Sequence, residues 1–279
     1  MLVEHPFSVR NGSGDLVRGD LRYIDDGVPK PAVLVCHGFT AHKDWGPFPY
    51  FGRKLAERGL TTIVFNFSHN GIGSDSTAFS EYDKFSRNTP GKELEDVQAL
   101  LDAVTAGEFG DGIIDARRIG MAGHSRGGGI SILTAGNDER VGAVVAWSTV
   151  ATFFRYTKHQ KDDWERRGYI QLRFGSARTL LRDDLSVLRD LEANKERYDL
   201  HRGAGRLKVP TLYLHGEADV IVRLGEAEGL YKLTDRSLSE FVLLQGAGHM
   251  YGAMHPFKET NPTIEHLLDF TARWFHEKL

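Results

Sequence analysis

Ser125 is the residue whose surroundings point most directly to chemistry. It stands at the centre of Gly123-His124-Ser125-Arg126-Gly127, between a short apolar run and an apolar helical pattern. A serine hydroxyl is a weak nucleophile, and a sharp turn from a strand into a helix exposes it to a neighbouring histidine. Glycine on each side leaves the backbone the space for such a turn. The spacing predicts a nucleophile, although a glycine-rich connecting loop could have the same pattern.

The nucleophile needs a base, and His249 is the candidate. It lies in a glycine-flanked loop directly after the predicted strand 239–244. A histidine in such a loop can reach a serine at the same edge of a sheet. His255 is the competing histidine.

A carboxylate must orient the base, and Asp219 is the candidate. It follows the predicted strand 209–215 and a turn glycine, with Glu217 as a nearby competitor. Asp219 could instead cap the next helix. The order Ser125, Asp219, His249, with each residue after its own strand, predicts a Ser-Asp-His triad.

Two backbone N–H groups are the candidates for an oxyanion hole. The predicted strand 32–36 runs into His37-Gly38-Phe39. Gly38 allows a turn that aims the N–H of Phe39 at the nucleophile, and the N–H of Arg126 supplies the second donor. A generic turn at the end of a strand is the alternative interpretation.

The elements that must position these residues alternate along the chain. Segments 7–10 and 16–24 predict an N-terminal antiparallel hairpin. Apolar strands and helices then alternate, which predicts an α/β fold with a mostly parallel sheet covered on both faces. The strands are expected at 32–36, 61–66, 118–122, 141–147, 209–215 and 239–244, and the helices at 47–58, 91–106, 126–135 and 264–275.

Residues 151–206 interrupt this alternation with many charged and aromatic residues. A small hairpin is expected from 169–174 and 178–181 around Gly175-Ser176, followed by a helix over 182–199. Because the insertion follows a sheet strand, it should lie over the carboxyl edge where open α/β sheets bind ligands. We expect a single domain over 1–279 with residues 151–206 as an inserted cap.

The chain resembles the α/β-hydrolase superfamily over nearly its whole length. The motifs that carry the resemblance are His37-Gly38-Phe39, Gly123-His124-Ser125-Arg126-Gly127-Gly128, His215-Gly216-Glu217-Ala218-Asp219 and Gly248-His249. Within it, the chain is most similar to cinnamoyl and feruloyl esterases, dienelactone hydrolases and the catalytic domain of prolyl oligopeptidases. Dienelactone hydrolases have a cysteine in place of Ser125, which argues against that lactonase activity. No β-propeller is expected within these residues, which argues against a size-gated oligopeptidase.

The resemblance implies a serine hydrolase that cleaves carboxylic esters of small to medium acyl or aryl groups through an acyl-enzyme. An amide or peptide hydrolase or a thioesterase would use the same triad, because a shared fold does not fix the leaving group. A ligand sensor without turnover is the third interpretation.

The substrate pocket is expected near the ends of the same strands. His37, Gly38, Trp147, Phe153 and Trp164 are its predicted residues, since aromatic side chains suit an acyl or aryl group. Other aromatic or histidine residues of these loops are Phe39, His42, Trp45, Phe154, Tyr156 and Tyr169. Any of these aromatic side chains could instead seat the cap on the main domain.

Other chemistry has weaker support in the sequence. His69 and Asp75 could line the pocket without taking part in the reaction. No cluster has metal-ligand spacing, so no metal is expected. Gly71 and Gly73 lack the third glycine and the distal acid of a dinucleotide site, so no cofactor is expected.

Composition narrows the class of protein. The 279 residues carry a net charge of −3, which does not favour nucleic acid or an anionic membrane as a partner. The single cysteine, Cys36, excludes an intramolecular disulfide. No signal peptide or membrane-length apolar run is recognisable, so a cytoplasmic protein is expected. The resemblance implies a small-molecule ester as its substrate. The cap and the edge-strand surfaces could each pair two copies as a homodimer.

Overall fold

The computed structural model describes residues 1–74, 78–173 and 180–279. Asp75 and the predicted turn at Gly175-Ser176 lie outside these residues. The strands are β1 (Leu2–Arg10), β2 (Leu16–Ile24), β3 (Lys30–Cys36), β4 (Thr61–Asn66), β5 (Ile114–His124), β6 (Val141–Trp147), β7 (Tyr169–Arg173), β8 (Leu180–Asp184), β9 (Thr211–Gly216) and β10 (Ser239–Leu244). The helices are α1 (Phe48–Glu57), α2 (Tyr82–Phe85), α3 (Pro90–Thr105), α4 (Arg126–Ala135), α5 (Lys158–Arg167), α6 (Leu185–Ala193), α7 (Leu200–Arg206), α8 (Leu224–Tyr231) and α9 (Pro262–Lys278).

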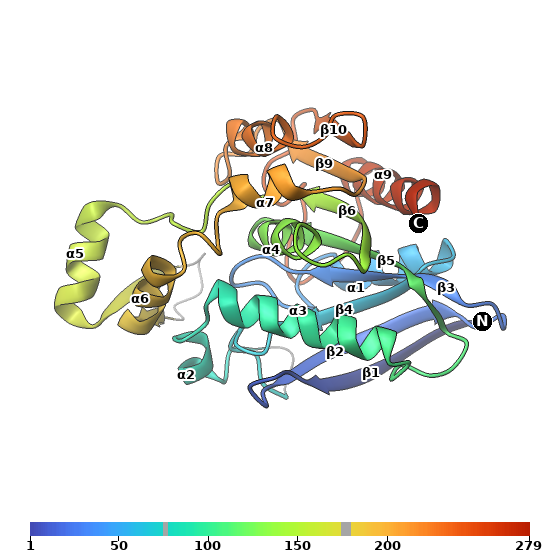
Figure 1. The fold of residues 1–279 in the computed structure, drawn as a ribbon, viewed down its shortest axis with the longest axis horizontal. Helices are drawn as coiled ribbons and strands as arrows, with labels where there is room; N and C mark the ends of the chain where they lie inside the picture. Colours follow the sequence, from blue (N-terminus) through green and yellow to red (C-terminus); the bar gives the residue numbers. More distant parts are fainter. Residues whose placement is uncertain (75–77, 174–179) are drawn as a thin grey trace.

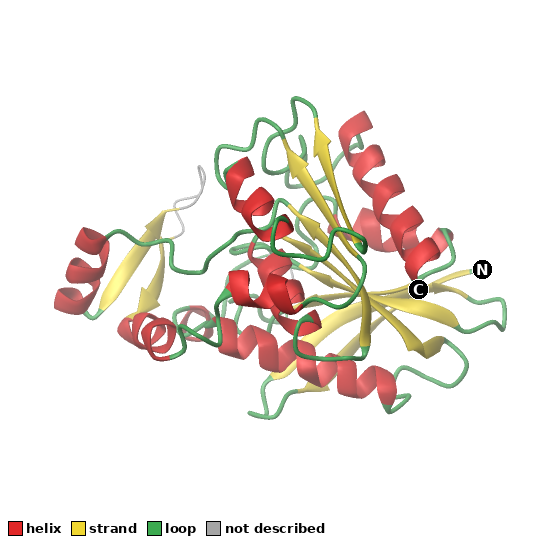
Figure 2. Ribbon diagram, turned by 45° about the horizontal axis from the view of Figure 1, so that its top comes forward, coloured by secondary structure: helices red, strands yellow, loops and turns green. Residues whose placement is uncertain are grey.

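Eight of these strands form one twisted sheet in the order β1-β2-β4-β3-β5-β6-β9-β10 (Figures 1 and 2). The pairs β1–β2 and β2–β4 are antiparallel, and all the other pairs are parallel. Because β3, β5, β6, β9 and β10 are parallel neighbours, their carboxyl ends meet at one edge of the sheet. The predicted N-terminal hairpin and mostly parallel sheet are confirmed.

The sheet separates two hydrophobic cores because alternate side chains of each strand point to opposite faces. In β3, Leu34 and Cys36 pack with the apolar side chains of α3 and α4, whereas Val33 and Val35 pack with those of α1 and α9. Helices therefore cover both faces of the sheet. This is the layered α/β architecture expected from the alternation of the elements.

Most of the predicted elements match the observed ones within a few residues. The helix predicted over 182–199 is present only in part, at Leu185–Ala193. Residues up to Asp184 belong to β8, the helix α6 ends at Ala193, and α7 begins only at Leu200. The backbone N–H of Asp184 donates to the carbonyl oxygen of Ser86 at 2.7 Å, and residue 184 pairs with Tyr169 in the small sheet. These tertiary contacts hold residues 182–184 in an extended conformation.

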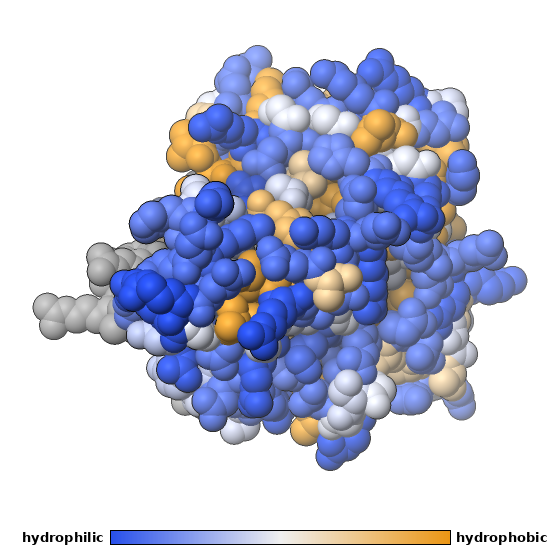
Figure 3. All heavy atoms as spheres, turned by 60° about the vertical axis from the view of Figure 1, so that its left-hand side comes forward, coloured by the Kyte–Doolittle hydropathy of each residue, from blue (hydrophilic) through white to orange (hydrophobic). Residues whose placement is uncertain are grey.

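The segment between β6 and β9 projects from the main domain. The antiparallel pair β7–β8, with α5 and α6 beside it, stands away from the central sheet (Figures 1 and 2). The third helix of the segment, α7, packs against α4 instead. The face that carries this segment is mostly hydrophilic, with small apolar areas between polar side chains (Figure 3). Within the described ranges, no helix is both long and apolar enough to cross a membrane.

Candidate active site

Ser125 occupies a strained turn between β5 and α4. Its backbone has φ 53° and ψ −114°, a left-handed conformation that is rare for a residue with a side chain. A Cβ on Gly123 would lie 2.2 Å from the carbonyl oxygen of Gly127, and one on Gly127 would lie 2.3 Å from the carbonyl oxygen of Cys36. Only glycine fits at these two positions. The sharp turn from a strand into a helix that the sequence predicted at Ser125 is therefore present.

The loops after β9 and β10 bring Asp219 and His249 together. Nδ1 of His249 lies 2.7 Å from Oδ2 of Asp219. The other carboxylate oxygen, Oδ1, accepts the N–H groups of Ile221 and Val222, each at 2.9 Å. Burial raises the pKa of Asp219, but the hydrogen bonds from His249 and these N–H groups outweigh it and lower the pKa to about 2. Asp219 is therefore a charged partner that fixes the imidazole.

The two competing residues have other contacts. Glu217 accepts the N–H of Gly246 at 3.0 Å, on the exposed side of the same loop. His255 accepts the N–H of Gly46 at 3.1 Å and stacks on Trp45.

Ser125 and His249 face one cavity of about 450 Å³. Within the described ranges, no hydrogen bond joins the Ser125 hydroxyl to the imidazole. Such contacts are often long without a substrate and tighten when one binds. The side chain of His124 binds the loop that carries His249, since its Nε2 donates to the carbonyl oxygen of His249 at 3.0 Å. Burial lowers the pKa of His124 to about 3, so the ring is neutral.

The two predicted oxyanion donors lie beside the serine. A Cβ on Gly38 would be only 3.4 Å from the Cβ of Ser125, so the turn that carries Phe39 lies close to the nucleophile. Arg126 is the first residue of α4, where backbone N–H groups have no acceptor within the helix. Phe39 and Arg126 both line the cavity.

His37 lies behind the turn and not in the cavity. Its Nδ1 donates to the carbonyl oxygen of Gly38 at 2.8 Å, and its Nε2 accepts the N–H of Phe67 at 3.3 Å. Burial lowers the pKa of His37 to about 3. The prediction that His37 contacts the substrate is corrected: its hydrogen bonds hold the turn that carries Phe39.

The other predicted pocket residues divide into two groups. Gly38 and Phe153 line the cavity, whereas Trp147 and Trp164 do not. Trp147 points to the face of the sheet that α1 and α9 cover, where its Nε1 donates to the hydroxyl of Thr271 at 3.0 Å. Trp164 is completely buried in the projecting segment. Both corrections have one cause, because these large side chains complete hydrophobic cores.

The cavity wall is mainly apolar. Its described residues besides those already named are Thr40, Ala41, Trp45, Val150, Thr152, Arg155, Tyr156, Leu172, Ile221, Val222 and Met250. Trp45 and Tyr156 were among the aromatic candidates in the sequence, whereas His42, Phe154, Tyr169 and His69 do not line the cavity. Sequence reasoning missed His124 and Arg155, although His124 stands inside the serine motif.

The side chain of Arg126 was also missed. Its Nε donates to the Glu93 carboxylate, with contacts of 2.7 and 2.9 Å. Burial disfavours the charged guanidinium, but the attraction of Glu93 outweighs it and raises the pKa of Arg126.

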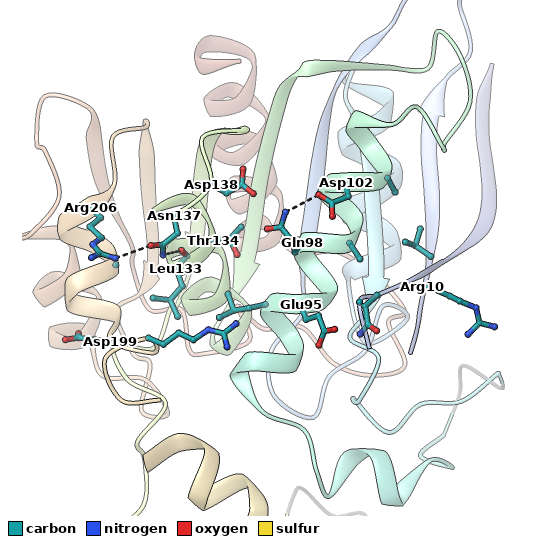
Figure 4. A pocket seen from close by; sticks show the side chains of 18 of the residues that line it. Arg10, Glu95, Gln98, Asp102, Leu133, Thr134, Asn137, Asp138, Asp199 and Arg206 are labelled. Atoms are coloured by element: carbon teal, nitrogen blue, oxygen red, sulfur yellow. Dashed lines mark hydrogen bonds between the residues drawn. The ribbon is translucent and has the colours of Figure 1, made fainter. Parts of the chain in front are cut away.

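A second, larger groove of about 1170 Å³ lies between α3, α4 and α7. It shares no described lining residue with the cavity at Ser125. Its polar side chains pair with one another: Arg206 donates to Asn137 at 3.1 Å, and Gln98 donates to Asp102 at 3.1 Å (Figure 4). Within the described parts of the chain, no three metal-binding side chains lie close enough to hold an ion.

Comparison with known proteins agrees with this architecture. The model of the prolyl oligopeptidase family matches residues 53–278. An uncharacterised 31.7 kDa protein from the traX-finO intergenic region of Escherichia coli is 29% identical over 126 residues, which are 45% of this chain and 39% of that protein. The putative esterase YitV of Bacillus subtilis (strain 168) is 24% identical over 212 residues, 75% of this chain and 76% of that protein.

Solved structures share the fold. The α/β hydrolase GrgF from Penicillium sp. sh18 superimposes with a TM-score of 0.72 at 17% identity, with 99% of each chain covered. Together with the family match, this confirms the α/β-hydrolase fold. The chain belongs to the prolyl oligopeptidase family.

Proposed function

We propose that the protein hydrolyses carboxylic esters of small to medium acyl or aryl groups, with Ser125, His249 and Asp219 as its catalytic triad. The observation that carries the proposal is the convergence of a strained Ser125 and a carboxylate-bound His249 on one mainly apolar cavity of about 450 Å³. A cavity of this size suits a small organic substrate. The similarity to the putative esterase YitV supports the ester class.

In the first half of the reaction, His249 takes the proton of the Ser125 hydroxyl while Oγ bonds to the ester carbonyl carbon. The carbonyl oxygen becomes an oxyanion, and the N–H groups of Phe39 and Arg126 stabilise it. When the bond to the alkoxy oxygen breaks, His249 gives its proton to that oxygen and the alcohol leaves.

In the second half, His249 takes a proton from water, whose oxygen attacks the acyl carbon. The bond to Ser125 then breaks, Oγ regains a proton from His249, and the acid is released. Asp219 stays ionised throughout and stabilises the imidazolium form of His249 in both halves.

Peptide or amide hydrolysis is the second candidate, because the family model that matches is that of prolyl oligopeptidases. The same steps would then release an amine instead of an alcohol. The two functions differ in the leaving group, so one substrate panel can separate them.

The test is turnover of p-nitrophenyl acyl esters, methyl cinnamates and an aminoacyl p-nitroanilide by wild type and by Ser125→Ala. We expect ester turnover that falls at least about 10³-fold in Ser125→Ala, because the nucleophile is lost. Ser8→Ala changes an exposed serine of β1 and is the matched control. Preferential cleavage of the anilide would favour the peptidase function. An active Ser125→Ala would contradict the assignment of the nucleophile.

A further inference from the structure

The guanidinium of Arg126, at the cavity that contains Ser125, has hydrogen-bond donors without acceptors. It carries five N–H groups, and only the one on Nε has an acceptor among the described residues. Nη2 is buried without a partner. Polar groups inside proteins are almost always paired, and an unpaired donor costs about 1–3 kcal/mol. Nη2 is closed to solvent, so the donors that a ligand in the cavity could reach are those of Nη1, which have no acceptor among the described residues either.

The charge of Arg126 is already balanced. Glu93 is 2% exposed, and its carboxylate accepts from Nε of Arg126 and, at 2.8 Å, from the side-chain amide of Asn88. A substrate carboxylate would add a second anion to this buried pair, and burying an uncompensated charge is costly. An uncharged oxygen needs no further cation. The local charge balance therefore favours a neutral acceptor.

Aromatic side chains hold the guanidinium in place. Its central carbon lies 5.4 Å from the ring centre of Phe39 and 5.4 Å from that of Phe153. Both rings line the cavity. The nearby hydroxyl of Tyr156 is occupied, since it donates to Asp183 at 3.2 Å. The free N–H groups of Arg126 are thus fixed polar points on an apolar wall.

We propose that the Arg126 side chain determines specificity by binding an uncharged oxygen, such as a ketone, ether or amide oxygen, in the acyl part of the substrate. This inference rests on the proposed function, in which the backbone N–H groups of Phe39 and Arg126 bind the ester carbonyl oxygen. The side chains of the same two residues then flank the acyl group, which is bonded to Ser125 in the acyl-enzyme between the two halves of the reaction.

The test uses three p-nitrophenyl esters of similar length: the pentanoate, the 4-oxopentanoate and the monosuccinate. They present a methylene group, a neutral carbonyl oxygen and a carboxylate at similar distances from the scissile bond. Each kcat/KM is divided by the rate of alkaline hydrolysis of the same ester, which removes differences in intrinsic reactivity. We expect the wild type to prefer the 4-oxopentanoate over both other esters by about tenfold, the effect of one good hydrogen bond.

Two variants separate the side chain from its surroundings. Glu93→Gln combined with Arg126→Met removes the guanidinium without leaving a buried carboxylate unpaired, and it should reduce the preference to about onefold. Arg155→Met is the matched control, because this second arginine of the cavity already donates to Glu226 at 2.6 Å and to the carbonyl oxygen of Ile221 at 2.9 Å. It should keep the preference.

The outcomes are distinguishable. If the wild type cleaves none of the three esters, the proposed function fails and this inference fails with it. If it cleaves all of them with equal normalised rates, or prefers the monosuccinate, only the inference is overturned. The preference of the wild type for the 4-oxopentanoate is measured without any variant, so it tests the inference even where a variant does not fold. Arg126→Lys keeps a cation beside Glu93 but loses the planar fork, so it should also lower the preference, even if the double variant does not fold.

Discussion

At the scale of single residues, Asp219 is held in its charged form by hydrogen bonds to both carboxylate oxygens. Two backbone N–H groups bind Oδ1 and the imidazole of His249 binds Oδ2. With its pKa lowered to about 2, the carboxyl is ionised at every pH above about 4. It therefore accepts the Nδ1 proton of His249, and in the proposed mechanism Nε2 is the atom that accepts a proton from Ser125.

We predict that Asp219→Asn lowers kcat by about 10³–10⁴-fold while the protein stays folded. The amide oxygen can still accept from Ile221 and Val222, but an NH₂ group would then face Nδ1 of His249. The imidazole proton would move to Nε2, where it prevents removal of the proton from Ser125.

The measurement is kcat on the best p-nitrophenyl ester, with circular dichroism to confirm folding. Glu217→Gln, the neighbouring carboxylate on the exposed side of the loop, is the control and should keep kcat within a few-fold. A large loss in Glu217→Gln with little loss in Asp219→Asn would show that the acid had been assigned wrongly.

At the scale of elements, the junction between the projecting segment and the main domain contains a buried carboxyl group. Asp183 in β8 is 2% exposed, and its Oδ1 has no hydrogen-bond partner among the described residues. Burial raises the pKa of Asp183 to about 7, although the charge of Arg126 and the hydroxyl of Tyr156 oppose the rise. The folded protein thus keeps this proton at pH values where the unfolded chain, with a pKa near 3.9, has lost it.

This difference fixes the sign of a pH effect. Between about pH 4 and pH 7 the folded state binds more protons at Asp183 than the unfolded state, so its contribution to the free energy of unfolding falls as the pH rises. The limiting slope is about 1.4 kcal/mol per pH unit. Below about pH 4 the group is protonated in both states and has no effect.

We predict that Asp183→Asn removes this loss, because the amide is neutral at every pH. The melting temperature of Asp183→Asn relative to wild type should rise between pH 5 and pH 8. Thermal unfolding followed by circular dichroism measures the difference. Asp162→Asn, at an exposed position of α5, is the control and should show a constant difference. A constant difference for Asp183→Asn as well would contradict the assignment.

At the scale of the whole molecule, α9 completes the core on one face of the sheet. Phe275 is fully buried, and a Cβ on Gly120 of β5 would lie 2.5 Å from its ring. The last helix thus packs directly against the strand that leads to Ser125. A homodimer through the cap or through an edge strand, β1 or β10, stays a prediction from sequence.

We predict that Phe275→Ala lowers the free energy of unfolding by about 3–5 kcal/mol, because it removes a large buried ring and leaves a cavity. Chemical denaturation of the folded protein measures this change. His276→Ala, at the next and exposed position, is the control and should stay within about 0.5 kcal/mol of wild type. Equal stability of the two variants would show that α9 does not contribute to the core in solution.

The sequence by itself determined the sheet, the serine turn and the pairing of Asp219 with His249. Apolar strands that alternate with helices can bury their side chains only between two helical layers, and Gly123 and Gly127 are required by local sterics. Asp219 and His249 were recognisable because each follows a strand, and parallel strands end at one edge. These features depend on patterns of residues that are close together in the sequence.

Only the tertiary structure decided which side chains reach the cavity. In the sequence, His37, Trp147 and Trp164 were candidates for the pocket in the same way as Phe153. In the structure the first three are bound or buried by residues distant in the chain, such as Thr271 for Trp147. The free donors of Arg126 depend likewise on Glu93, 33 residues earlier. The direction of a side chain is set by the neighbours that pack around it, and those neighbours meet only when the chain has folded.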